Sequence, residues 1–270
     1  YFYTNTLHQR LAGPAPAADR LHPRPESSLR APWFAVSCCP TNIARTFASL
    51  AAYFATADDG GIQLHQYADC EIRTVLADGS PVGLDVRTGY PDEGSVSVEV
   101  TETGAAPWSL SLRVPEWARN GAVLVDAAGT PAPADPGTVT LTHRFAVGDR
   151  VTVLLPVRPR WVSPDPRIDA IRGTAAVERG PLVYCLESVD LPAGRHVDEV
   201  RVDTSADPAE TAGQVRVSGE LVKSADTTWP YPALDHDGAV PHAERVEIPL
   251  LPYHAWATRG PATMRVWLPA

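Results

Sequence analysis

The sequence predicts a mainly β protein, in which two consecutive antiparallel β-sandwich domains follow a loop and a single helix. Three observations support this prediction. Short β-prone runs alternate with Gly, Pro and Asp turns from Gly61 to the end of the chain. Apolar residues alternate within runs such as SVSVEV and TVTLT, as a half-buried strand requires. Only the stretch that follows the first cysteines carries apolar residues at a convincing helical spacing.

The composition bounds the size of the fold and the kinds of partner. The chain has 270 residues, 44% of them hydrophobic, which suffices for one large or two ordinary domains. A net charge of -9 and the lack of a basic run disfavour a nucleic-acid partner. No apolar stretch approaches the ~20 residues that span a membrane, so we expect no membrane partner. The sequence carries no signature of an oligomeric state.

The first elements are a loop and a helix. Residues 10–32 are rich in Pro, Ala and Arg and predict a long loop over a surface. The helix that follows presents one apolar face, formed by Ile43, Phe47, Leu50 and Phe54. Pro40 suits its first turn, where no N–H donor is required. The turn residues DDGG at 58–61 predict the end of this helix.

Short strands follow one another after this helix. About seven of them at close spacing predict an antiparallel sandwich over residues 62–158. A second β-rich block, punctuated throughout by Pro and Gly, predicts another sandwich over residues 159–270. The chain is therefore expected to have three segments, of which residues 1–61 are the first.

The four cysteines include an adjacent pair, Cys38 and Cys39, immediately before the predicted helix. Unpaired N–H groups and the positive end of the helix dipole favour a thiolate there, which makes either sulfur a better nucleophile or metal ligand. The alternative is that both are small buried thiols that fill the core. A disulfide, either Cys38–Cys39 or Cys70–Cys185, is a third possibility.

The segment WFAVSCCPTNIARTFASLAAYF resembles the signature of the family 127 glycoside hydrolases, the zinc-dependent β-L-arabinofuranosidases, and of the related family 146. The shared pattern is an aromatic pair, Cys-Cys-Pro, and then Asn-Ile/Leu-Ala-Arg opening a helix. YFYTNTL is similar to the family's Tyr-x-Asn-Pro-Leu segment, with Thr6 in place of the usual proline. TGYPDEGSVSVEV and LSLRVPEWA resemble its middle β-domain. AVERGPLVYCLE and LLPYHAWATRGPATMRVWLP resemble its C-terminal β-domain.

The resemblance implies a fold and a chemistry. Residues 1–61 would be the C-terminal end of a catalytic (α/α)6 barrel, followed by a middle β-sandwich domain (62–158) and a C-terminal one (159–270). The activity implied is a retaining hydrolysis that releases β-L-arabinofuranose from non-reducing ends of an arabinose-containing glycan or glycoconjugate. Cys38 would be the nucleophile and a Zn²⁺ ligand, and Cys39 a second ligand. Zn²⁺ would keep the sulfur deprotonated, and a glutamate would act first as acid and then as base.

The sequence departs from the family pattern upstream of the cysteines. The family's other two zinc ligands form a Glu-x-Cys motif there, and its acid/base glutamate and the histidines of its sugar pocket also lie upstream. None of these is in the 270 residues, which open in mid-pattern without an initiator Met. We therefore expect the C-terminal part of such an enzyme, inactive by itself. A metal-bound thiolate fits a reducing cytoplasm better than an oxidising compartment, although an upstream export signal stays open.

A few other residues are candidates for the site. Tyr3 is a candidate for lining the sugar pocket, with a core tyrosine as the equal alternative. Asn42 and Arg45 follow the cysteines on the helix; Asn42 would brace the turn and Arg45 would hold a nearby carboxylate. Glu178 and Glu187 flank RGPLVYC and could be read as paired carboxylates, but we assign them structural roles.

A second interpretation belongs to a different class of protein. The same strands would also suit a non-catalytic β-sandwich protein that binds carbohydrate or supports another domain. The Cys-Cys-Pro helix separates the two interpretations, because a pure binding module has no need of it.

Overall fold

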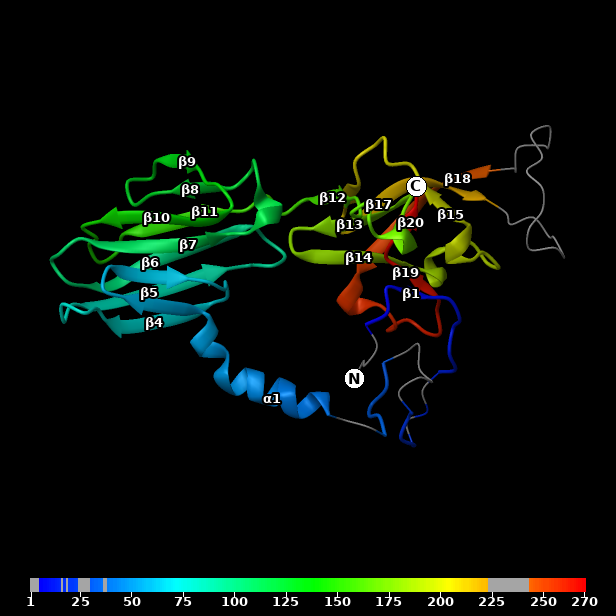
Figure 1. Ribbon diagram of the computed structural model, residues 1–270, viewed down its shortest axis with the longest axis horizontal. Helices are drawn as coiled ribbons and strands as arrows, with labels where there is room; N and C mark the ends of the chain where they lie inside the picture. Colours follow the sequence, from blue (N-terminus) through cyan, green and yellow to red (C-terminus); the bar gives the residue numbers. More distant parts are fainter. Residues whose placement is uncertain (1–4, 16, 18, 24–29, 36–37, 223–242) are drawn as a thin grey trace. The chain divides into compact units, whose positions relative to one another are not determined.

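The computed structural model describes residues 5–15, 17, 19–23, 30–35, 38–222 and 243–270. The chain divides into two compact units: unit 1 comprises residues 1–37 and 158–270, and unit 2 comprises residues 38–157. The predicted mainly β architecture is confirmed, because over the described residues both units are built of sheets, and the single α-helix is α1, Cys39–Ser49 (Figure 1).

The units group the first residues of the chain differently from the predicted segments. The N-terminal strand β1, His8–Gln9, pairs with β19, Met264–Arg265, which makes it part of unit 1. Helix α1 belongs to unit 2. The predicted segments 1–61, 62–158 and 159–270 stay a prediction about domains, and the pairing of β1 with β19 is a long-range contact that no local pattern indicates.

The strands of unit 2 form two sheets over the described residues. The first has the order β10, Gly137–His143; β7, Trp108–Val114; β3, Gly61–Leu64; and β2, Ala55–Asp58. The second has the order β4, Cys70–Val75; β5, Pro81–Thr88; β6, Ser95–Thr103; β11, Arg150–Leu154; β8, Val123–Val125; and β9, Pro131–Pro133. Their pairs are antiparallel except that β3 runs parallel to β7.

One hydrophobic core lies between these two sheets. Val96, Val98 and Val100 of β6 are fully buried, and the residues between them in the sequence face outward. Leu110 and Leu112 of β7, in the other sheet, belong to the same cluster. Burying each such aliphatic side chain contributes about 1.5–3 kcal/mol, so the alternating pattern of the sequence is a main source of the stability of unit 2.

The predicted end of the helix is wrong. Helix α1 stops at Ser49, a 3-10 helix covers Leu50–Tyr53, and strand β2 begins at Ala55. The DDGG sequence at 58–61 is instead the turn between β2 and β3, in which the Asp58 carboxylate accepts the N–H groups of Gly60 and Gly61. An aspartate that caps its own turn is equally compatible with a helix end and a hairpin, which is why the sequence misled us.

The strands of unit 1 form one hydrogen-bonded network over the described residues, and all its pairs are antiparallel. Its main order is β1, β19, then β14, Leu182–Glu187; β18, Ala243–Pro252; β17, Gln214–Val222; and β15, Val200–Val202. The remaining strands are β12, Pro159–Val162; β13, Thr174–Arg179; β16, Ala209–Thr211; and β20, Leu268–Pro269. Short 3-10 helices lie at Glu116–Ala118 in unit 2 and at Asp169–Ile171, Ser188–Asp190, Val197–Glu199 and Tyr253–Ala255 in unit 1.

Two hydrophobic clusters stabilise unit 1. The larger joins buried residues of β17 and β18, among them Val217 and Ile248, to β14. The smaller contains Cys185, Trp256 and Met264, all fully buried. No helix in the described part of the chain is long and apolar enough to cross a membrane.

Candidate functional site

The cysteine pair, Cys38 and Cys39, lies where the sequence places it, at the start of α1. Cys38 precedes the first helical residue, Cys39 is that residue, and Pro40 occupies the first turn. Neither thiol is in a disulfide, both are exposed, and their Sγ atoms are 3.9 Å apart. The pair is therefore accessible to a ligand, and it is not the buried core filler of the alternative reading.

The first turn of α1 holds the backbone around the pair. The Thr41 hydroxyl donates to the Cys38 carbonyl oxygen at 2.9 Å. Because the first four N–H groups of a helix have no partner within it, the sulfurs lie at an electropositive end. No acidic residue of the first turn offsets this charge.

Asn42 and Arg45 contact one another on the same helix. Arg45 donates from Nη1 to the Asn42 Oδ1 atom at 3.1 Å. The Asn42 carbonyl also accepts the hydroxyl of Thr46, at 2.9 Å. Among the described residues Arg45 has no carboxylate partner, so the supporting roles expected of this residue and of Asn42 stay predictions. Tyr3, the other candidate, lies outside the described residues.

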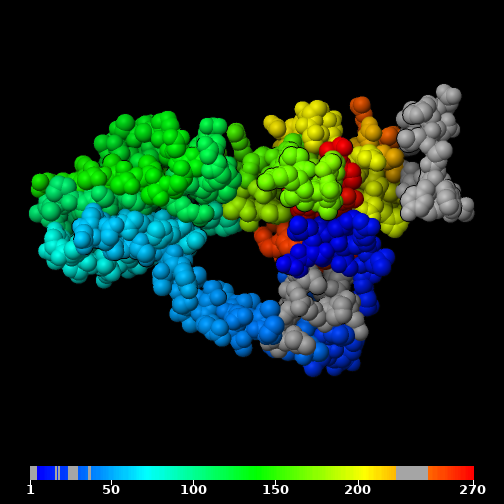
Figure 2. Space-filling view, in the orientation of Figure 1, coloured from blue at the N-terminus to red at the C-terminus, as the bar shows by residue number. Residues whose placement is uncertain are grey.

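The apolar face of α1 is largely exposed within the described chain. Ile43 is 49% exposed and Phe47 is 70% exposed. Leu50, in the 3-10 turn that continues the helix, is exposed as well, whereas Phe54, the last residue of the predicted face, is half-buried. No residue of α1 is buried, although all of α1 is described. The helix lies at the surface (Figure 2), outside the core of its own unit.

The geometry of the cysteine pair fits half of a zinc site. Two thiolates on one tetrahedral Zn²⁺, each at about 2.3 Å, lie about 3.8 Å apart. The 3.9 Å between the Cys38 and Cys39 sulfurs agrees with that separation. Within the described residues no group of three or more His, Cys, Asp and Glu side chains could hold a metal. The two sulfurs can thus supply two of the ligands of a zinc site.

The other two cysteines differ from this pair in burial. All four cysteines are among the described residues and none forms a disulfide, so neither predicted disulfide is present. Burial raises the pKa of the Cys185 thiol, and the nearby Glu187 carboxylate raises it further. Burial, followed by the carboxylates of Asp85 and Asp69, raises the pKa of Cys70 as well. Such thiols are poor nucleophiles at neutral pH.

A buried ionic cluster in unit 1 is a feature that the sequence did not reveal. Glu187 has no exposed surface, and its carboxylate accepts hydrogen bonds from the Ala257 N–H and the Arg259 guanidinium. Arg259 also bonds to Asp190, and these carboxylates raise the pKa of Arg259, although burial opposes the shift. Glu187 is therefore structural, as predicted, whereas its partner lies 72 residues away and has no local signal.

Comparisons with known proteins match nearly all of the β-rich part of the chain. Residues 61–157 match the domain described as "Beta-L-arabinofuranosidase, GH127 middle domain". Residues 159–269 match the "Glycoside hydrolase family 127 C-terminal domain".

Similarity to individual proteins supports the same family. The chain is 32% identical to a non-reducing end β-L-arabinofuranosidase of Bifidobacterium longum subsp. longum, over 99% of this chain and 41% of that protein. A GH127 β-L-arabinofuranosidase from Geobacillus stearothermophilus T6 superposes with a TM-score of 0.79 at 29% identity, covering 100% of this chain and 42% of that one. A further structure, described as a glycoside hydrolase, gives a TM-score of 0.80 at 29% identity and covers 44% of its chain. The chain thus spans less than half the length of the relatives it matches. On its middle and C-terminal domains, the chain belongs to glycoside hydrolase family 127.

Proposed function

We propose that these residues are the C-terminal part of a retaining glycoside hydrolase that releases β-L-arabinofuranose from the non-reducing ends of an arabinose-containing glycan or glycoconjugate. The family membership and the names of the relatives support the reaction class. The observation that carries the proposal is the exposed cysteine pair with its 3.9 Å sulfur separation. The pair offers an accessible nucleophile, which a β-sheet protein that only binds or supports another domain would not need.

In this proposal Cys38 is the nucleophile. Its sulfur attacks the anomeric carbon of the sugar and forms a carbon–sulfur bond, while the glycosidic oxygen leaves and takes a proton from a carboxylic acid. Water then attacks the same carbon, loses a proton to that carboxylate, and releases the sulfur. Two displacements at one carbon retain its configuration. The acid/base glutamate belongs to the upstream sequence that the family resemblance implies.

The chain's own residues prepare the sulfurs for this step. Bound Zn²⁺ would hold both cysteines as thiolates and fix their separation. Cys38 and Cys39 would be two of its ligands, and the others would come from upstream residues. The Thr41 hydroxyl holds the Cys38 carbonyl, which limits how far the backbone of the nucleophile can move. Asn42 and Arg45 brace the next turn of the helix through their mutual contact.

Two further expectations complete the proposal. The 270 residues alone do not hydrolyse a glycoside, because the described residues supply only two zinc ligands and no acid beside them. A reducing compartment such as the cytoplasm suits the protein, because adjacent exposed thiols oxidise readily elsewhere. The glycan is the only partner that the proposal requires.

A second function is favoured by one observation. No residue of α1 is buried, and none belongs to the hydrophobic clusters of either unit. The strands could therefore serve as a carbohydrate-binding or scaffold β-sandwich protein with no catalytic role. This alternative predicts that the cysteines can be replaced with no change in function.

The test combines metal content with turnover of an aryl β-L-arabinofuranoside by the full-length protein. We expect about one Zn²⁺ per chain. Cys39→Ala should lower the zinc content, and Cys38→Ala should lower kcat by about 10³-fold or more with the fold retained. Cys70→Ala, which changes a half-buried thiol elsewhere in unit 2, is the matched control and should keep both. Unchanged turnover by Cys38→Ala would contradict the proposal and favour the scaffold function.

A further inference from the structure

A groove in unit 1 lies where neighbouring strands of the sheet end. Strand β19 is paired with β1 on one side and with β14 on the other. Just beyond the paired residues, Arg10 follows β1, Thr263 precedes β19 and Ser188 follows β14, and all three line the groove. Residues 191–196 add to the lining, and the volume of the groove is about 610 Å³. A hollow of that size can hold a small molecule or part of a larger one.

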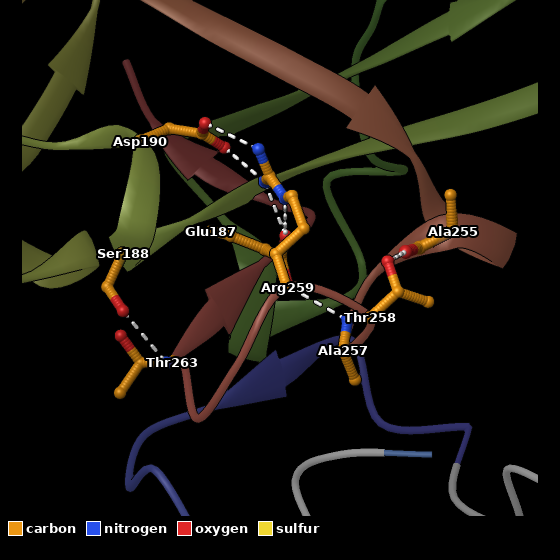
Figure 3. Close-up of polar contacts among 8 residues, drawn as sticks. All are labelled: Glu187, Ser188, Asp190, Ala255, Ala257, Thr258, Arg259 and Thr263. Atoms are coloured by element: carbon orange, nitrogen blue, oxygen red, sulfur yellow. Dashed lines mark hydrogen bonds and ion pairs between the residues drawn. The ribbon is translucent and has the colours of Figure 1, made fainter.

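Two hydroxyl groups belong to the lining of this groove. Ser188 and Thr263 lie side by side (Figure 3): the Ser188 N–H donates to the Thr263 carbonyl oxygen at 2.9 Å, and the Thr263 N–H donates to the Ser188 hydroxyl at 3.0 Å. Thr263 is only 8% exposed, and its hydroxyl oxygen has no hydrogen-bond partner among the described residues. Because a buried hydroxyl without a partner costs free energy, this atom points to a polar ligand in the groove.

Positive charge lines the groove with no carboxylate beside it. Arg10 and Arg195 are lining residues, whereas no Asp or Glu is one in the described part of the chain. Arg195 is paired with Glu199 at 3.3 Å, but Arg10 has no ion-pair partner among the described residues. Burial lowers the pKa of the Arg265 guanidinium, and the nearby charge of Arg10 lowers it further, although Asp198 acts in the opposite direction. A negatively charged group beside Arg10 would offset this repulsion.

His196 supplies a further hydrogen-bond donor to the groove. One of its ring nitrogens accepts the backbone N–H of Glu199. In a neutral imidazole the other ring nitrogen then carries the proton, so it can donate to a ligand. Leu11, Val189 and Leu191 contribute apolar surface to the same lining. The groove therefore suits a ligand that combines negative charge and hydrogen-bonding oxygens with a carbon framework.

We propose that this groove, which we call the Arg10 groove, binds a carboxylate-bearing sugar residue of an acidic glycan. Arg10 pairs with the carboxylate, because a guanidinium and a carboxylate can form two parallel hydrogen bonds. His196 and the two hydroxyls bond to hydroxyl groups of the sugar, and the apolar side chains contact its C–H groups. A peptide fits less well, because its N–H groups need acceptors and the described lining side chains include no carboxylate or carboxamide. This binding site goes beyond the reaction proposed above and does not depend on it.

The first test measures binding of a galacturonic acid trisaccharide to the full-length protein by isothermal titration calorimetry at low ionic strength. We expect a Kd of about 1 mM or lower, and Arg10→Ala should weaken binding about tenfold or more. Ala193→Glu places a negative charge in the exposed part of the lining and should weaken binding at least as much. Arg167→Ala is the matched control: it removes the same charge from an exposed arginine of unit 1 that bonds to Asp165 outside the groove, and it should bind as the parent does.

The second test varies the ligand. The methyl ester of the same trisaccharide keeps the sugar but loses the charge, so it should bind about tenfold more weakly or worse. Inorganic phosphate and a tetraglutamate peptide should compete with the trisaccharide only at about tenfold higher concentrations or above.

Several results would overturn the proposal. These are a lack of binding, equal binding by Arg10→Ala and the parent, and equal binding of the methyl ester. Phosphate that competes as well as the trisaccharide would indicate a general anion site instead, and a peptide that binds more tightly would indicate a protein partner. None of these measurements uses turnover of an arabinofuranoside, so the Arg10 groove and the proposed function can fail independently.

Discussion

The thiols at the start of α1 and the thiol of β14 show how burial decides the chemistry of one residue type. Cys185 is fully buried beside Trp256 and Met264, and its pKa is raised by burial. Cys38 and Cys39 are exposed, adjacent and only 3.9 Å apart at their sulfurs. Cys185 is thus an apolar core residue, and the pair has the accessibility that a nucleophile or metal ligand needs.

The same contrast holds for the apolar residues of the two regions. Valines and leucines of the β-strands alternate with polar residues and meet a core within the chain. The apolar residues of α1 follow a helical period just as clearly, yet they remain exposed. A periodic pattern therefore predicts which face an element buries, but not whether the partner of that face lies in the same stretch of sequence.

The largest expected difference between the two regions is in thiol reactivity. With metal removed by a chelator, an aromatic disulfide reagent should modify Cys38 or Cys39 in the native chain at least about 10³-fold faster than Cys185. Cys185 can react only when its unit opens. At equilibrium about one native protein molecule in 10³, or fewer, is in such an open state. The rates are measured by absorbance, and the sites by mass spectrometry. The double variant Cys38→Ala/Cys39→Ala should lose the fast phase, and its persistence would show that another thiol is exposed.

Truncation of apolar side chains should show an intermediate effect. Leu84→Ala, in the core of unit 2, should lower the free energy of unfolding by about 2–5 kcal/mol. Phe47→Ala, on the 70% exposed face of α1, should change it by less than about 0.5 kcal/mol. Urea unfolding followed by tryptophan fluorescence measures both. An equal loss in the two variants would show that the face of α1 is covered in solution.

The sequence indicated most strands because their signal is local. Alternation in SVSVEV and TVTLT is visible within a few residues, and β6 and β10 follow it. Strand β2 was missed because ATAD is short and continues directly from a helical stretch. The parallel pairing of β3 with β7 depends on contacts between residues about fifty positions apart, such as Gly61 with Ser109. No single-sequence pattern contains that information.

The functional and structural residues likewise include some that the sequence predicted and some that it did not. The cysteine pair was found because both sulfurs and the helix start lie within one short motif. The ion pair of Glu187 with Arg259 was not predicted, because the two residues are 72 positions apart in the sequence and meet only in the folded protein. Glu187 could be assigned a structural role from sequence, but its burial and its contact with the Ala257 N–H required the structure.

The smallest expected effect is the dependence of stability on pH that Cys185 causes. An unfolded chain ionises a cysteine near its ordinary pKa of about 8.5, whereas the folded chain keeps this thiol protonated because its pKa is raised. Above about pH 8.5 the unfolded state therefore binds fewer protons, and stability falls as the pH rises, by at most about 1.4 kcal/mol per pH unit from this group. Urea unfolding at pH 8.5 and 9.5 measures the slope below the range where tyrosines ionise.

The comparison of variants isolates the contribution of the thiol. Cys185→Ala should flatten the slope, although it also removes a buried sulfur and lowers stability at every pH. Val183→Ala, on the same strand and packed against the same cluster, is the control for that loss of packing and should keep the original slope. An equal slope in Cys185→Ala and the parent would show that the buried thiol ionises as readily as an exposed one, which would remove the distinction between Cys185 and the pair at α1.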